Sequence, residues 1–142
     1  MIFVASLAFL LAAANAPTLE QVRADQNAEH RAHLAIDYAA AAEKAAETAN
    51  DKGDQTEVAS QLHNMVAAIE LARDSFAAAG KTPVRQPGSF KNAELRTHEI
   101  LVRLGDFRHK VDEEQRAPIE SSIMKIQEIH DVWFEGIMGK KK

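Results

Sequence analysis

Apolar residues recur at alternating intervals of four and three in four segments of the chain, and this periodicity gives each of four helices one apolar face. After residue 17, no alternation of β-branched and polar residues is long enough to predict a strand. The chain has 142 residues and no cysteine, and 27% of its residues are charged, which excludes disulfide-stapled and low-complexity proteins. The sequence therefore predicts an all-α fold in one domain, residues 17–142.

An uncharged apolar run, residues 2–14, precedes this domain and ends in small residues of the kind that signal peptidases accept. The run is shorter than the roughly 20 apolar residues that span a bilayer. We interpret residues 1–16 as a signal peptide, in preference to an uncleaved anchor or a buried helix. The n-region lacks Lys and Arg, and Pro17 would follow a cut after Ala16, so a cut after Ala14 is the alternative. The mature protein is expected to be exported, periplasmic or secreted, without stable membrane insertion.

Capping residues and glycines predict the ends of the first two helices. The first is expected from Thr18 to Lys52, although the polar residues 25–27 are a point at which it could break. The second is expected to begin at Asp54, which matches a capping box with the glutamate three residues later, and to stop at Gly80. The short connection makes these two helices an antiparallel hairpin.

Prolines and a serine predict where the other two helices begin. Residues 81–88 contain two of the four prolines and are expected to form a loop, after which Ser89 caps the third helix. An acidic turn, residues 112–114, leads to Pro118, which suits the first turn of the fourth helix. Gly139 is expected to end that helix.

Four amphipathic helices joined by short connections favour an up-down-up-down antiparallel four-helix bundle, with two stacked helical hairpins as the alternative. The first helix carries a shallow apolar face of alanines. We expect large side chains from the other helices to fill the space beside it. They are Phe76, Phe90, Phe107 and Trp133.

The chain has six histidines and no cysteine, which is the one unusual feature of its composition. His130 lies in the apolar seam of the fourth helix, and counting residues from each turn places His98, Glu70 and Tyr38 near the same level. Such a cluster could hold a transition metal or a non-covalent haem, with His98, His130 and Glu70 as candidate ligands. A core histidine hydrogen-bonded to Glu70, Tyr38 or water explains the same pattern.

The sequence lacks the motifs that are typical of several kinds of catalytic and cofactor sites. No histidine follows a glutamate by three residues, which argues against a di-metal carboxylate bundle, and covalent haem would need cysteines. Nucleophile-elbow, zinc-protease and glycine-rich phosphate motifs are missing too. The sequence therefore predicts a protein that is not an enzyme and that has no cofactor, unless the histidine cluster holds a metal or haem.

The charges are unevenly distributed along the chain. Residues 17–80 carry eleven acids and five bases, whereas residues 81–110 carry seven bases and three acids. This basic segment either pairs with the acidic helices of its own bundle or binds an anionic partner. The candidate partner-binding residues are Lys91, Arg96, Arg103 and Arg108. The net charge of −4 does not favour nucleic-acid binding.

Two functions follow as hypotheses. The first is an exported, non-enzymatic interaction or structural module that binds another envelope protein or self-associates. The alternative is a metal or haem carrier that uses the histidine cluster inside the bundle.

Overall fold

The computed structural model describes residues 16–139, and all regular structure in this range is helical, which confirms the all-α class. The elements are α2 (Leu19–Arg23), α3 (Ala28–Asp51), α4 (Gln55–Ala78), α5 (Pro87–Lys110), the short 3₁₀ helix η1 (Glu113–Gln115) and α6 (Arg116–Ile137). Within residues 16–139, no helix is both long and apolar enough to cross a membrane. The expected signal peptide falls on residues 1–16, of which all but the last lie outside the described part, so it stays a prediction.

The predicted first helix is interrupted and forms two helices. Thr18 and Gln21 make the expected capping box at the start of α2. Asn27 then caps α3 by accepting a hydrogen bond from the backbone N–H of His30. The side chain of Asp25 accepts one from the backbone N–H of Asn27. These local hydrogen bonds offer the backbone an alternative to the helix, so the chain breaks at the polar residues.

Glycines end three of the helices at the predicted places. Gly53, Gly80 and Gly139 have φ angles of 74°, 73° and 70°, a conformation that ends a helix and costs glycine little. The start of α5 differs from the prediction, because Pro87 begins the helix and Ser89 lies inside its first turn. Proline suits the first position of a helix because a backbone N–H there would have no partner within the helix. Gln86, which precedes Pro87, is at the N-cap position, so Ser89 is not the cap.

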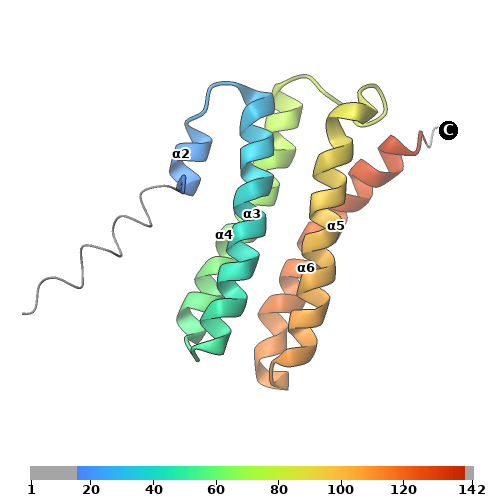
Figure 1. Cartoon of the computed structure of the whole chain (residues 1–142). Coiled ribbons are helices and arrows are strands. Elements are labelled where there is room, and N and C mark those ends of the chain that lie inside the picture. The colour runs from blue at the N-terminus through green and yellow to red at the C-terminus, as the bar shows by residue number, and fades with distance from the viewer. Residues whose placement is uncertain (1–15, 140–142) are drawn as a thin grey trace, which may run out of the picture.

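Consecutive long helices run in opposite directions, which agrees with the expected up-down-up-down order (Figure 1). α3 pairs with α4 and α5 pairs with α6, so the chain forms two hairpins. The hairpins pack with α3 beside α5 and α4 beside α6. Within the described residues, the backbones of α3 and α6 do not lie side by side, and neither do those of α4 and α5. The bundle therefore consists of two hairpins side by side, as in the alternative arrangement, and the unpaired helices lie on its diagonals.

The core joins small side chains of α3 to large ones from the other helices. The buried alanines of α3 are Ala32, Ala35, Ala39, Ala42, Ala46 and Ala49. Phe76, Phe90, Phe107 and Trp133 are all buried, as predicted. The ring centroids of Phe76 and Phe90 lie 4.3 Å apart, and that of Trp133 lies 5.8 Å from Phe76. This aromatic cluster (Phe76, Phe90, Trp133) connects the two hairpins.

Candidate functional site

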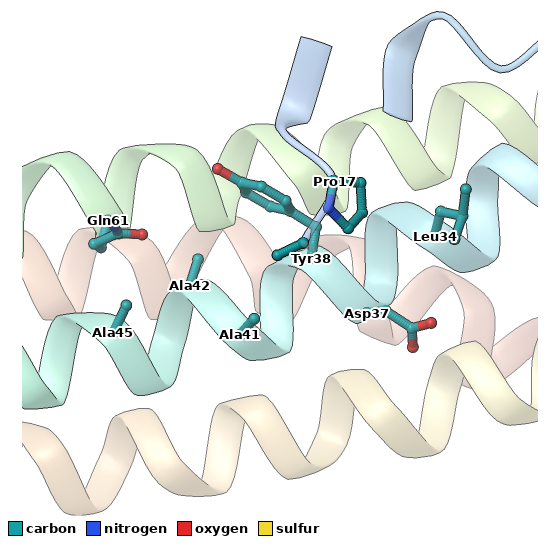
Figure 2. A pocket seen from close by; sticks show the side chains of 9 residues that line it. Pro17, Leu34, Asp37, Tyr38, Ala41, Ala42, Ala45 and Gln61 are labelled. Atoms are coloured by element: carbon teal, nitrogen blue, oxygen red, sulfur yellow. The ribbon is translucent and has the colours of Figure 1, made fainter. Parts of the chain in front are cut away.

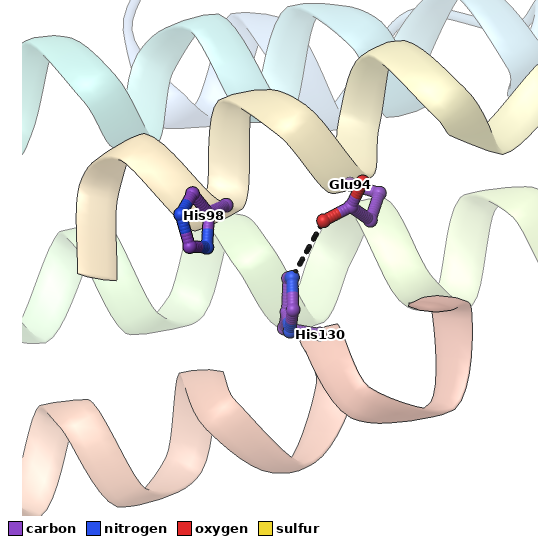
Figure 3. A group of neighbouring side chains, drawn as sticks. All are labelled: Glu94, His98 and His130. Carbon is purple, nitrogen blue, oxygen red and sulfur yellow. Dashed lines mark hydrogen bonds and ion pairs between the residues drawn. The ribbon is translucent and has the colours of Figure 1, made fainter. Parts of the chain in front are cut away.

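Three side chains that can bind a metal gather where α5 lies beside α6 (Figure 3). α5 supplies Glu94 and His98, which share one helix face because they are four residues apart. α6 supplies His130, whose Nε2 lies 2.8 Å from Oε2 of Glu94. One ligand atom from each residue lies within 4.8 Å of the other two. We call this group the Glu94–His98–His130 cluster.

His130 is held in place by its neighbours. Its side chain is 9% exposed, and its Nδ1 lies 3.2 Å from Oδ1 of Asp131. Gln127 donates a hydrogen bond of 2.7 Å to the same Asp131 oxygen. The imidazole ring also stacks on Phe134, with ring centroids 6.0 Å apart. Each ring nitrogen of His130 therefore faces a carboxylate oxygen, and the ring orientation is fixed.

The cluster lies in a groove between α5 and α6 with a volume of about 690 Å³. Its remaining lining residues include Leu95, Leu101, Val102 and Phe134. Leu95 and Val102 are 59% and 51% exposed, which is high for large apolar side chains. No Lys or Arg is among the described residues that line the groove, whereas two carboxylates are. We call it the α5–α6 groove; it is apolar at its edges and acidic where the histidines lie.

The structure brings together His98 and His130 but leaves out the other two residues expected at their level. Glu70 is half-buried on α4, outside the cluster; the pKa of the nearby Arg73 guanidinium is raised mainly by its hydrogen bond with Asp74, and the charge of Glu70 adds to this. Tyr38 lies on α3, which is diagonal to α6. The carboxylate beside the histidines is Glu94, which sequence analysis missed. The spacing of four residues between Glu94 and His98 is the signal that could have identified it.

Tyr38 lines a separate pocket of about 360 Å³ on the outer side of α3 (Figure 2). The other residues around it are mostly small or apolar, and Pro17 lies beside the tyrosine. The one carboxylate of the lining, Asp37, accepts a hydrogen bond of 2.7 Å from Arg96. The pocket therefore presents little chemistry that would select a ligand.

The basic residues of α5 pair largely with the acidic side of α3. Besides the Arg96 contact, Arg103 donates hydrogen bonds to Glu43 (2.6 Å) and Glu47 (3.0 Å). Lys91 and Arg108 have no ion pair within the described residues. Two of the four candidate partner-binding residues thus contribute to contacts between the two hairpins.

Glu43 is a buried carboxyl group at this contact, and its side chain has no exposed surface. Burial, reinforced by the neighbouring Glu47 carboxylate, raises the pKa of Glu43 to about 7, although Arg103 acts in the opposite direction. The hydrogen bond with Glu43 is the main cause that lowers the pKa of Glu47. Glu43 and Glu47 therefore hold one shared proton more readily than two isolated glutamates would.

No known family matches this chain. No family model fits it, and no curated protein or solved structure shows significant similarity.

Proposed function

We propose that this protein is a non-enzymatic interaction module whose α5–α6 groove receives an amphipathic helix of a partner protein. The observation that supports the proposal is the position of the exposed apolar residues. Seven large hydrophobic side chains are exposed among the described residues, and six of them belong to α5, α6 or the residue that follows α6. They are Leu95, Val102, Met124, Val132, Phe134 and Met138, of which Leu95, Val102 and Phe134 line the α5–α6 groove. The seventh, Val84, lies in the loop before α5.

The shape and charge of the groove indicate what kind of helix fits. Two adjacent antiparallel helices leave a furrow that accepts the apolar stripe of a third helix. Leu95, Val102 and Phe134 would contact that stripe, while Glu94 and Asp131 favour a helix with Lys or Arg beside its apolar residues. The partner is therefore proposed to be apolar and basic. Its identity as another envelope protein depends on the predicted export and is part of the proposal.

A pair of designed helical peptides tests the proposal. One carries a leucine stripe flanked by lysines, and the other has the same stripe flanked by glutamates. We expect the lysine peptide to bind with a dissociation constant in the micromolar range and the glutamate peptide to bind much more weakly, as measured by fluorescence anisotropy at physiological salt.

Two matched variants locate the binding surface. Val102→Lys places a charge in the groove and should abolish binding of the lysine peptide. Val132→Lys makes the same change at a residue that is 63% exposed and does not line the groove, and it should leave binding unchanged. Equal binding by both variants would refute the groove as the site. If the protein alone sediments as a dimer that Val102→Lys dissociates, the occupant is a second copy and the partner-helix proposal is wrong.

A further inference from the structure

The Glu94–His98–His130 cluster has the donor atoms of a transition-metal site. Two imidazoles and one carboxylate are a set that zinc uses in proteins, with a water or another ligand in the fourth position. All three side chains come from two adjacent helices of one chain, so the site needs no second molecule. The three ligand atoms already lie within 4.8 Å of one another.

The distances within the cluster are compatible with a small adjustment on binding. Ligand atoms of a tetrahedral zinc site lie about 3.3 Å apart, because each is about 2.0–2.1 Å from the metal. The Glu94 and His130 atoms lie 2.8 Å apart and would separate slightly, while the His98 atom would move closer. His98 is exposed and lies beside Glu94 and His130, so its side chain can turn without disturbing the core (Figure 3).

The neighbours of His130 supply an independent argument. Ligand histidines commonly donate their second ring N–H to a carboxylate, which fixes the ring and strengthens the ligand. Oδ1 of Asp131 lies 3.2 Å from Nδ1 of His130, where it is placed to accept such a hydrogen bond, and Gln127 donates a hydrogen bond to the same oxygen. Nε2 of His130 is thereby aimed at the cluster.

We infer that Glu94, His98 and His130 bind one divalent transition-metal ion, for which zinc is the best match. The fourth coordination position faces the open α5–α6 groove, where water or an added ligand can occupy it. The inference does not depend on a partner helix, because all three protein ligands belong to this chain.

The test is a titration of the untagged full chain, freed of metal by a chelator that is then removed, with Zn²⁺ against a chromophoric chelator. We expect one equivalent of Zn²⁺ to bind with micromolar or tighter affinity. Co²⁺ used as a probe should give the intense visible absorption of a tetrahedral site. Zn²⁺ should also raise the melting temperature, because it binds the folded chain.

Three variants and a control assign the ligands. His98→Ala and Glu94→Gln should each weaken Zn²⁺ binding at least about tenfold, and Asp131→Asn should weaken it about tenfold through the orientation of His130. His63→Ala removes an exposed histidine of α4 outside the cluster and should leave binding unchanged. Melting curves of the metal-free variants show that they fold. The inference is overturned if the wild-type chain binds no Zn²⁺ in this range, or if His98→Ala and His63→Ala bind it equally.

Discussion

The buried carboxyl group of Glu43 links the stability of the fold to pH. Burial raises its pKa to about 7 in the folded protein, compared with the 4.5 of an unperturbed glutamate, which the unfolded chain is expected to have. Between these values the folded protein keeps a proton that the unfolded chain has lost, so the free energy of unfolding decreases as the pH rises from about 4.5 to about 7. Well above pH 7 this loss is complete, and it amounts to roughly 3 kcal/mol.

We predict that Glu43→Gln removes this pH dependence. The amide cannot ionise, but its oxygen can still accept the hydrogen bond from Arg103. The melting temperature of the variant should therefore rise relative to wild type as the pH increases from 5 to 8. Glu99→Gln alters an exposed glutamate of α5 and should leave the wild-type profile unchanged. Parallel profiles for Glu43→Gln and wild type would show that Glu43 does not carry the effect.

The sequence predicts two of the three residues of the candidate site, His98 and His130, but not Glu94. A seam position and residue counts along the helices were enough to place His98 and His130 at one level. The same counts could not tell which helices are neighbours, and Tyr38 and Glu70 were expected inside the bundle with them. The histidines instead meet on the outer side of α5 and α6, where Glu94 is within reach and Tyr38 is not.

At the scale of the elements, α6 approaches the loop before α5 closely at Gly136. A Cβ atom at this residue would lie 2.5 Å from Cγ and 2.6 Å from Cβ of Pro83. These distances are shorter than a van der Waals contact, and the proline ring cannot turn away. The glycine thus permits α6 to pack against the segment that joins the two hairpins.

We predict that Gly136→Ala lowers the free energy of unfolding by about 1–3 kcal/mol, because the clash outweighs the better helix propensity of alanine. Gly105→Ala is the matched control. Gly105 lies inside α5, and a Cβ there would have no atom within 4 Å, so the substitution should stabilise by up to about 1 kcal/mol. Chemical denaturation of both variants measures the two effects. Equal shifts of the same sign would rule out the Pro83 contact as the cause.

Helix ends were predictable where one residue decides the backbone conformation. Gly53, Gly80 and Gly139 ended their helices as expected, because few other residues adopt a positive φ without cost. The beginning of α5 was not predictable in the same way, since both Pro87 and Ser89 suit an N-terminus and no local pattern ranks them. The break after α2 depends on competing hydrogen bonds around Asp25, which a sequence pattern indicates only as a weak point.

At the scale of the whole molecule, the aromatic cluster makes the two hairpins depend on each other. Phe76 belongs to the first hairpin, and Phe90 and Trp133 belong to the second. The ion pairs of Arg96 and Arg103 with α3 add further contacts between them. Neither hairpin can separate from the other without exposing these rings and the buried Glu43.

We predict that the chain unfolds in one cooperative transition. The single tryptophan, Trp133, reports on α6 by fluorescence, whereas circular dichroism reports on all helices. The two signals should give the same midpoint.

Phe76→Ala removes a buried ring of the first hairpin and should lower the free energy of unfolding by about 3–5 kcal/mol. Phe76→Leu, a milder change, should shift both signals together. A fluorescence change that precedes the loss of helix would mean that the hairpins unfold separately.

The all-α class and the alternating helix directions were predictable, since periodicity defines the helices and short connections make consecutive ones antiparallel. The neighbour relations between hairpins were not. An apolar stripe indicates that a helix has a buried face, but it does not indicate which other helix covers that face. The segment between α4 and α5 decides this, because it joins two helices on a diagonal of the bundle.

The alanine face of α3 restricts how this sequence can evolve. Ala35, Ala39 and Ala46 are fully buried, so nearly every substitution there adds volume where none is available. Three apolar side chains of the α5–α6 groove, Leu95, Val102 and Phe134, are exposed and can be exchanged with little cost to the fold. Natural variation should therefore accumulate at these exposed positions and spare the buried face of α3, so that the surface between α5 and α6 changes while the scaffold stays the same.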